Sequence, residues 1–405
     1  MPLRKPVSPD VLSPELREPN GRARPNTGLG VPAHRNAEAR IDLGQLGRNI
    51  EITRTRLVGT KLLFPVKADE YGHGSREIAL RAQEAGVDGF GVGNLFEARR
   101  LREAGVTAPI LILSPSRPEL ADELVDTDAA VAISCPEMAG ALEGAAAAAS
   151  RTVPVHVKVD TGLGRDGLPV EAASHFVEHL RRSCPHLEVE GIFSHLSVAY
   201  SEEEDARAYT RRQIDSFNEL LAILDRRGLL PPLRHIANSS ALVQHRVAVT
   251  SGYLNMVRPG ILLYGYPEVR RPWTDEIRPI LSLVTWVVSL KDVPPGRSLG
   301  YGRAHRTRSW TKIATLPVGY GDGIPPGMAR ACTVVVGGHR APIIGGVSMD
   351  QMSVEVTKVP GGRVGDEVEL LGGASPADEV ARALDLGVTE ILLTGISPHL
   401  KRTFR

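Results

Sequence analysis

The chain has 405 residues, and its 48 Lys and Arg residues nearly balance its 47 Asp and Glu residues. This length exceeds the size at which a single hydrophobic core stops growing, which favours two domains over one. The near-zero net charge argues against nucleic acid and anionic membranes as partners, so we expect a small-molecule partner.

The first segment, residues 1–36, is rich in proline, arginine and turn-forming residues and lacks the apolar stretch of a secretory signal. We expect a disordered tail, with a basic targeting or docking arm as the alternative. Cys135, Cys184 and Cys332 are widely separated and form no metal-binding pattern, so they predict neither a disulfide framework nor a metal site and fit a reducing cytoplasm. The longest apolar run, residues 280–290, is too short to span a bilayer.

Short apolar runs alternate with amphipathic helical stretches from about residue 60. Eight of these runs are candidate strands: residues 61–68, 88–94, 109–115, 129–134, 153–160, 187–197, 233–239 and 256–265. This alternation predicts an α/β fold, a (β/α)8 barrel over residues 37–275, with an open doubly wound sheet as the alternative. Residues 38–50 look like a strand followed by a helix start, and this strand could pair with either domain.

The pattern changes near residue 275, where helical periodicity gives way to β-rich runs separated by Gly and Pro turns. We therefore expect residues 276–405 to form a second, mostly β domain.

Polar residues gather where the predicted barrel strands end, which is where barrels of this type carry their chemistry. They are Lys67, Lys158, Asp160, His195, Asn238, Ser239 and Arg258. Each has an ordinary explanation when taken alone: a solvated strand end, a buried histidine, a salt-bridged arginine or a helix cap. Their occurrence together at one rim favours a site.

The residue types at this rim indicate a particular ligand. A lysine desolvated at a barrel mouth loses its proton readily, and the neutral amine forms a Schiff base with a carbonyl. The segment "ANSS" and the nearby "RPGI" offer N–H groups and hydroxyls to an anion such as phosphate. The chain has no P-loop pattern, which disfavours a nucleoside triphosphate. A carbonyl, a phosphate and an aromatic ring together describe pyridoxal 5′-phosphate (PLP).

Eight segments occur in the order and approximate spacing of one known family. They are "VKADEYGHG", "KVDTGLGRDG", "FSHLS", "HIANSS", "MVRPGILLYG", "LGYGRAHRT", "PVGYGDG" and "VSMDQMSVEV". From about residue 38 to the C terminus, the chain resembles the alanine racemase family. The resemblance implies a PLP-binding barrel with a C-terminal β domain, a head-to-tail homodimer whose sites are shared across the interface, and a small amino acid, alanine, as substrate.

The resemblance also implies roles for single residues. Lys67 would hold PLP and serve as one catalytic base, and Tyr301 would be the opposing base, reaching the site from the partner subunit. The remaining implied contacts are the phosphate ligands Tyr71, Ser239, Gly260 and Ile261, the ring contacts His195 and Arg258, the substrate-carboxylate contacts Arg165 and Met349, and the supporting residues His235 and Asp350.

Lys158 has two interpretations. In some family members the matching lysine is carbamylated and orients the arginine that corresponds to Arg165. An ordinary ion pair between Lys158 and Asp160 is an equal alternative.

Several positions depart from common patterns of the family: Glu70, Tyr200, Pro326, Gly346, Ser348 and Pro398. We expect most of them at the entrance or the inner gate of the site, so serine or another amino acid is an alternative substrate. A PLP-dependent decarboxylase is a further alternative, disfavoured because "SMDQ" stands where that enzyme needs a protonating cysteine. Without PLP, a Schiff-base aldolase using Lys67 would be the next interpretation.

Overall fold

The computed structural model describes residues 37–250 and 252–405, so the tail predicted for residues 1–36 lies outside the described residues. Eight parallel strands form a ring: β2 (Lys61–Pro65), β3 (Gly89–Val92), β4 (Ile110–Ile112), β5 (Ala130–Ile133), β6 (Val153–Asp160), β8 (Leu187–Phe193), β9 (Leu233–His235) and β10 (Met256–Val257). Pairing of β5 with β6 closes the ring and rules out an open sheet. The predicted barrel is confirmed, and each of the eight apolar runs contains one strand.

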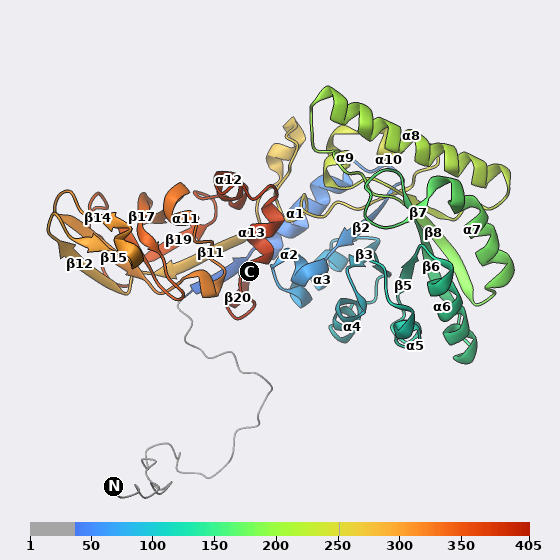
Figure 1. Ribbon diagram of the computed structural model, residues 1–405, viewed down its shortest axis with the longest axis horizontal. Coiled ribbons are helices and arrows are strands. Elements are labelled where there is room, and N and C mark those ends of the chain that lie inside the picture. Colours follow the sequence, from blue (N-terminus) through green and yellow to red (C-terminus); the bar gives the residue numbers. More distant parts are fainter. Residues whose placement is uncertain (1–36, 251) are drawn as a thin grey trace, which may run out of the picture. The chain divides into compact units, whose positions relative to one another are not determined.

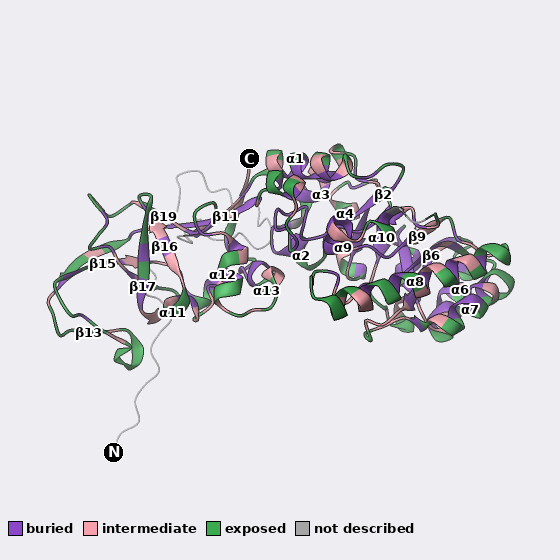
Figure 2. Ribbon diagram, turned by 90° about the horizontal axis from the view of Figure 1, so that it is seen from above, coloured by how far each residue is buried: buried purple, intermediate pink, exposed green. Residues whose placement is uncertain are grey.

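Helices cover the outside of this ring (Figure 1). They are α1 (Leu43–Arg54), α3 (Ser75–Glu84), α4 (Leu95–Glu103), α5 (Ala121–Val125), α6 (Pro136–Ala148), α7 (Val170–Ser183), α8 (Glu204–Arg226), α9 (Ser239–Gln244) and α10 (Val247–Thr250). In α7 the buried Ala173, Phe176, Val177 and Leu180 recur every three or four residues, so one face packs inward and the other meets solvent. Figure 2 shows this division in α6, α7 and α8.

The barrel strands are apolar because both of their faces are covered. Every residue of β3 and of β5 is buried. Since all eight strands are parallel, their carboxyl ends meet at one rim, and the loops that follow them converge there.

The second domain is built on a nine-stranded sheet. Its strand order is β12 (Ser289–Val293), β15 (Thr311–Leu316), β18 (Met352–Glu355), β17 (His339–Val347), β16 (Thr333–Val336), β19 (Glu367–Leu371), β11 (Leu281–Trp286), β1 (Ala37–Ile41) and β20 (Lys401–Phe404). Three short helices accompany it: α11 (Met328–Ala331), α12 (Ala377–Ala383) and α13 (Thr389–Thr394). The predicted mostly β character of this domain is confirmed.

The first strand of the described chain belongs to this second sheet. β1 pairs antiparallel with β11 and parallel with β20. The range 37–275 expected for the barrel therefore includes one strand of the other sheet, and the pairing that the sequence left open is decided in favour of the second domain. The boundary near residue 275 stays a prediction. Within the described ranges, no helix has the length and apolarity needed to cross a bilayer.

The turn after β2 has an unusual backbone. Residues 68–71 all have φ between 50° and 55°, in the left-handed region. That region costs about 1–2 kcal/mol for each residue other than glycine. The carboxylate of Glu97 in α4 stabilises the turn by accepting hydrogen bonds from the backbone N–H of Ala68 at 2.8 Å and of Gly93 at 2.7 Å. The turn presents two side chains to the barrel mouth: Lys67, which precedes it, and Tyr71, its last residue.

Gly72 ends this turn where the chain meets α13 of the second domain. Its φ is 80°, and an added Cβ would lie 2.0 Å from the backbone oxygen of Leu393. The backbone oxygen of Gly72 also accepts a hydrogen bond from Arg402 at 2.9 Å. A glycine is therefore required for both conformation and close approach, and this contact ties the turn after β2 to the second domain.

Replacing Gly72 with alanine should lower the free energy of unfolding by at least about 2 kcal/mol, because left-handed strain and the clash with Leu393 add together. Gly59 is the matched control: its φ is 67°, but no atom lies within 4 Å of the added Cβ. Gly59→Ala should lose only about 1 kcal/mol, the cost of the left-handed backbone. Denaturant titration of both variants measures the difference in their free energies of unfolding. If both variants lost the same free energy of unfolding, the close approach to Leu393 would contribute nothing to the cost of the Gly72 substitution.

Candidate active site

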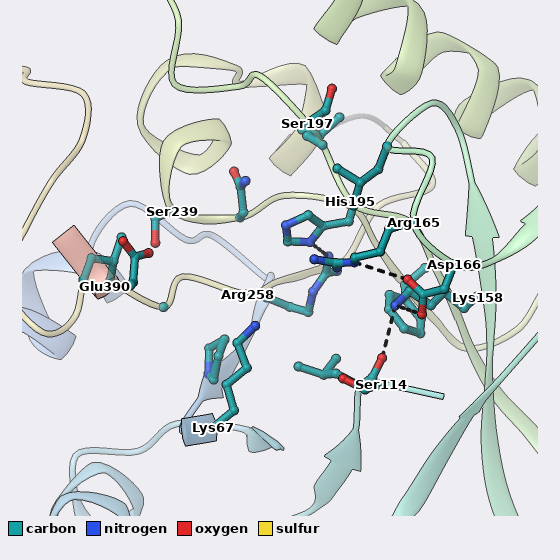
Figure 3. A pocket seen from close by; sticks show the side chains of 18 of the residues that line it. Lys67, Ser114, Lys158, Arg165, Asp166, His195, Ser197, Ser239, Arg258 and Glu390 are labelled. Atoms are coloured by element: carbon teal, nitrogen blue, oxygen red, sulfur yellow. Dashed lines mark hydrogen bonds and ion pairs between the residues drawn. The ribbon is translucent and has the colours of Figure 1, made fainter. Parts of the chain in front are cut away.

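The rim at the carboxyl ends of the strands opens into a cavity of about 630 Å³, a size that suits a small molecule. Most of the site residues predicted from the sequence line it: Lys67, Tyr71, Lys158, Arg165, His195, Ser239, Arg258, Gly260 and Ile261. Figure 3 shows side chains from β2, β6, β8 and β10 or their following loops converging on this space. The barrel thus gathers residues that lie up to about two hundred positions apart in the chain.

Lys67 follows β2 and reaches into the cavity (Figure 3). Its side chain is accessible from the cavity, yet the surrounding protein partly removes it from water. This desolvation lowers the pKa of Lys67, and the positive charge of Arg165 acts in the same direction. A neutral amine is therefore easier to form here than on a surface lysine.

Arg258 is buried at the floor of the cavity, with 4% of its surface exposed. It donates hydrogen bonds to Nδ1 of His235 at 2.6 Å, to the backbone oxygen of Ser194 at 2.7 Å and to Nδ1 of His195 at 3.3 Å. Because a guanidinium has only donors, Nδ1 of both imidazoles must accept, and each ring carries its proton on Nε2 when neutral. Arg258 therefore determines the tautomer of both histidines.

Electrostatics keep these imidazoles neutral. Burial lowers the pKa of His195 and of His235 well below the ordinary value, and the charge of Arg258 adds to the effect. Burial lowers the pKa of Arg258 itself to about 9, which still leaves it positively charged at neutral pH. The cavity floor thus holds a fixed cation between two neutral rings.

His235 begins a chain of hydrogen bonds behind Arg258. Its Nε2–H donates to Nδ1 of His156 at 3.0 Å, and Nε2–H of His156 donates to the Glu190 carboxylate at 3.0 Å. The hydrogen bond from His156 lowers the pKa of Glu190. His235 lies behind the cavity wall and supports Arg258. His156 and Glu190 were not predicted from the sequence, although a polar residue within the apolar run of β6 was a usable signal.

A second part of the cavity has the donors needed to bind an anion. An added Cβ at Gly260 would lie 2.4 Å from the hydroxyl oxygen of Tyr71, so glycine is what lets the phenol lie against this backbone. Ser239 brings a hydroxyl that accepts a hydrogen bond from the Leu262 N–H at 3.2 Å. Among the described residues, the N–H groups of Gly260 and Ile261 donate no hydrogen bond and are free for a ligand.

Two carboxyl groups also line the cavity. Glu268 accepts a hydrogen bond from the hydroxyl of Ser240, and Glu390 enters from α13 of the second domain. Burial raises the pKa of Glu390, and the nearby Glu268 raises it further. Glu390 is therefore easier to protonate than an exposed glutamate. Neither residue was predicted from the sequence, because neither belongs to the segments that carry the resemblance.

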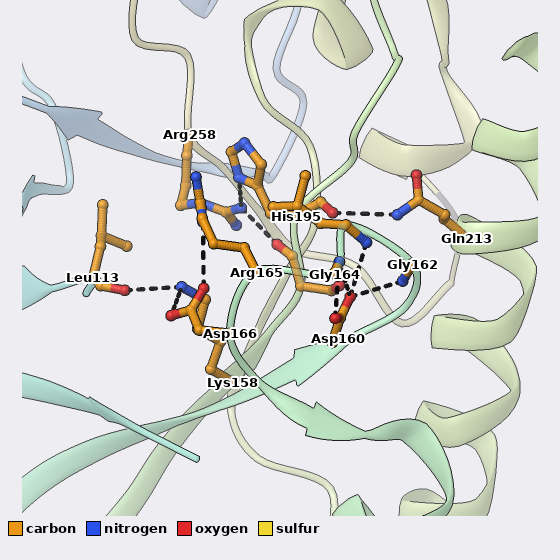
Figure 4. A network of polar contacts seen from close by, with 12 residues as sticks. Leu113, Lys158, Asp160, Gly162, Gly164, Arg165, Asp166, His195, Gln213 and Arg258 are labelled. Carbon is orange, nitrogen blue, oxygen red and sulfur yellow. Dashed lines mark hydrogen bonds and ion pairs between the residues drawn. The ribbon is translucent and has the colours of Figure 1, made fainter. Parts of the chain in front are cut away.

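The ion pair expected between Lys158 and Asp160 does not form, and that alternative was wrong. The Asp160 carboxylate instead accepts hydrogen bonds from the backbone N–H groups of residues 162, 163 and 164, at 2.8, 2.8 and 2.9 Å. Lys158 Nζ contacts Asp166 at 2.5 Å (Figure 4). Asp160 organises the loop after β6, and the next carboxylate of that loop, Asp166, neutralises the lysine.

Besides His235, three predicted residues lie outside the cavity of their own chain. Tyr301 and Met349 are 86% and 62% exposed, and the neighbouring Asp350 is also exposed. Of the departures from the family pattern, Tyr200 lines the cavity. Glu70 is buried in the turn after β2, away from the cavity, so its expected place at the entrance is not observed.

Comparison with known proteins assigns the family. Residues 41–268 match the family model described as alanine racemase, N-terminal domain, and residues 280–404 match alanine racemase, C-terminal domain. The chain belongs to the alanine racemase family. The resemblance drawn from the eight sequence segments is confirmed.

Individual relatives agree with this assignment. The chain is 38% identical to an alanine racemase of Desulfovibrio desulfuricans over 349 residues, covering 85% of this chain and 92% of the relative. It is 39% identical to an alanine racemase of Geobacter sulfurreducens over 336 residues, covering 82% and 87%. A solved alanine racemase from the D-cycloserine producer Streptomyces lavendulae aligns with a TM-score of 0.84 at 31% identity, covering 92% of this chain and 97% of the other.

His73, at the end of the turn that follows Lys67, makes stability depend on pH. Burial lowers the pKa of His73 to about 4, and its Nδ1 lies 3.0 Å from the backbone oxygens of Glu70 and Tyr71. As pH falls below 6.5, the unfolded chain takes up a proton that the folded chain resists, so the free energy of unfolding falls. At pH 5 this loss amounts to about 2 kcal/mol.

His73→Asn keeps a side-chain N–H donor but does not titrate. Denaturant titrations between pH 5 and 7 should therefore show a shallower loss of stability in this variant than in the wild type. His399→Asn is the control, because His399 is exposed, and it should keep the wild-type slope. A His73→Asn variant with an unchanged slope would contradict the prediction.

Proposed function

We propose that this chain interconverts L- and D-alanine with PLP held in the barrel cavity, and that Lys67 and the partner subunit's Tyr301 are the two groups that move the α-proton. Support comes from one feature of the cavity: a lysine with a lowered pKa shares it with possible anion donors, of which the N–H groups of Gly260 and Ile261 have no acceptor among the described residues. Membership of the alanine racemase family and relatives named alanine racemase agree with this function.

The residues present fit PLP. The Tyr71 hydroxyl, the Ser239 hydroxyl and the free N–H groups of Gly260 and Ile261 would hold its phosphate. His195 would pack against the ring and Arg258 would lie at the ring nitrogen, while Lys67 would hold the aldehyde carbon. When bound, PLP supplies an electron sink that makes the α-proton of an amino acid removable at neutral pH.

Lys67 handles the proton on one side of the α-carbon. Desolvation and Arg165 lower its pKa, so its neutral, proton-accepting amine forms more readily than that of a surface lysine. After accepting the proton, the same nitrogen serves as donor in the reverse direction. A single group on one face tends to return the proton to the side from which it came, so inversion needs a second group on the opposite face.

Arg165 is suited to hold the carboxylate of the substrate. Its Nε lies 3.4 Å from Asp166, and among residues 37–250 and 252–405 its terminal nitrogens make no recorded hydrogen bond. A planar guanidinium with free terminal nitrogens matches the geometry of a carboxylate. Arg258 stays protonated and keeps a positive charge at the floor of the cavity, where it cannot act as a proton acceptor.

The second proton-moving group is proposed to come from another copy of the chain. Tyr301 begins a 3-10 turn that packs against β17, and Met349 follows the end of β17. The backbone N–H of Gly321 donates to the Met349 oxygen at 2.8 Å, which brings the half-exposed Tyr320 to the same place. Tyr301, Met349 and Tyr320 are thus large side chains that the second domain exposes to solvent. Exposed aromatic and methionine side chains fit a homodimer contact.

The three cysteines support a cytoplasmic location for this activity. Cys135, Cys184 and Cys332 are all free thiols. Thiols that form no disulfide are typical of a reducing compartment.

An assay with single-enantiomer amino acids tests the function. Purified protein with added PLP, incubated with L-alanine in D₂O, should produce D-alanine and place deuterium at the α-carbon of both enantiomers. Lys67→Ala should lower kcat by roughly a hundred- to ten-thousandfold, because it removes one proton-moving group. Lys61→Ala is the matched control, since Lys61 is exposed at the other end of the same strand, and it should retain wild-type kinetics.

The same assay with L-serine and other amino acids defines the substrate. Inversion of serine but not alanine would overturn the assignment to alanine. Release of carbon dioxide without inversion would indicate a decarboxylase instead.

A further inference from the structure

The carboxylate of Asp166 lies between two cations at the side wall of the cavity. One of its oxygens contacts Lys158 Nζ at 2.5 Å, and the other lies 3.4 Å from Arg165 Nε. Figures 3 and 4 show the three side chains joined by these contacts, with the Arg165 guanidinium turned toward His195 and Arg258. One carboxylate therefore connects a lysine inside the barrel to the arginine that faces the substrate space.

Lys158 needs a negative partner at this position. It projects from β6 into the barrel with only 5% of its surface exposed, and a buried ammonium without a counter-charge is strongly unfavourable. Its other recorded polar contact is the neutral backbone oxygen of Leu113 at 3.3 Å. Since Asp160 is engaged by three backbone N–H groups, Asp166 is the carboxylate that neutralises Lys158.

The backbone around Asp166 is held at both ends. Asp160 holds the start of the loop through the N–H groups of residues 162–164. At the other end, Gly167 has a φ of 129°, and an added Cβ would lie 2.7 Å from the backbone nitrogen of Asp160. The next two residues form the short strand β7 (Leu168–Pro169) beside β6. The loop therefore places Asp166 against Lys158 through backbone contacts.

We propose that Asp166 is the positioning residue for Arg165: it supplies, from the chain itself, the carboxylate that neutralises Lys158 and fixes the guanidinium toward the substrate carboxylate, and Lys158 remains an unmodified ammonium. This inference rests on the proposed racemase function. It rejects both interpretations of Lys158 left by the sequence, because the ion pair forms with Asp166 instead of Asp160 and takes the place of a carbamate.

Carbamylation of Lys158 would be unfavourable in this geometry. Attachment of carbon dioxide requires a neutral amine. Burial lowers the pKa of Lys158 and so favours that form, whereas the Asp166 carboxylate at 2.5 Å opposes this shift. A carbamate would also place a second negative charge beside Asp166, and like charges at such a distance repel. Asp166 therefore both replaces the carbamate and opposes its formation.

Carbon-13 NMR of the full-length holoenzyme equilibrated with ¹³C-bicarbonate reads the state of Lys158 independently of activity. The wild type should show no protein-bound carbamate resonance at neutral pH. A carbamate resonance that is present in the wild type and absent from Lys158→Arg would overturn the proposal. This readout stands even if the enzyme proves to racemise no amino acid, so failure of the proposed function and failure of this inference are distinguishable.

Steady-state kinetics with L-alanine test the positioning role. Asp166→Asn keeps the size of the side chain and removes its charge, so it should raise KM by roughly ten- to a hundredfold, the usual effect of losing a hydrogen bond between charged groups. The fall in kcat should be smaller than the rise in KM. Asp166→Glu, which restores the carboxylate, should recover part of the lost affinity.

The matched control is Asp160→Asn, which keeps an oxygen acceptor for the loop N–H groups and should raise KM less than Asp166→Asn does. An unchanged KM in Asp166→Asn, or equal loss in Asp166→Glu and Asp166→Asn, would overturn the positioning role.

Discussion

The hydrogen bonds of Arg258 are the constraint on which the rest of the site depends. A buried guanidinium can only donate, so the two imidazoles beside it must accept and are held neutral. His235 in turn donates a hydrogen bond to His156, and His156 donates one to Glu190, a carboxylate nearer the surface. The tautomer set by Arg258 therefore determines the direction of the whole hydrogen-bond chain. The inner imidazole, His195, remains an uncharged ring at the cavity. The positive charge of the cavity floor is thereby fixed in position, and Lys67 and Arg165 line the same cavity.

The charged and hydrogen-bonding groups of the cavity fall into three separate regions of the barrel. The floor holds a permanent cation, one side holds hydroxyls and free N–H groups suited to a phosphate, and the other side holds the Lys158, Asp166 and Arg165 series. Each part comes from a different set of strands, so a parallel barrel is what brings them to one rim. The second domain adds Glu390 and holds the turn after β2 through Gly72.

The barrel and most of its polar rim were predictable from sequence, because alternating apolar runs determine strand positions and residues at strand ends must meet at one edge. Other features depend on contacts that no local pattern encodes. The left-handed turn at residues 68–71 is formed by residue types that do not prefer that conformation, and it relies on Glu97 from a later helix. The expected partner of Lys158 was wrong because backbone N–H groups occupy Asp160. Glu390 reaches the cavity from a distant part of the chain.

In the part of the chain that the structure describes, the cavity built by a single chain contains one group suited to accept the α-proton, Lys67, and lacks a matching group on the opposite face. Lys67 supplies an amine with a lowered pKa, whereas burial, with the charges of Glu390 and Glu268, raises the pKa of Tyr71 and makes that phenol a poor base. Tyr301 is exposed on the second domain, outside its own cavity. The central claim is therefore that a second copy of the chain completes each site.

Activity of a mixed dimer tests this claim most directly. Lys67→Ala and Tyr301→Phe subunits carry different affinity tags and should each be inactive as homodimers. The mixed dimer is purified through both tags. If Tyr301 acts across the interface, the mixed dimer contains one intact site and should show about half of the wild-type racemisation rate per dimer. If both groups acted within one chain, every site would lack one of them, and a mixed dimer as inactive as its parents would contradict the account.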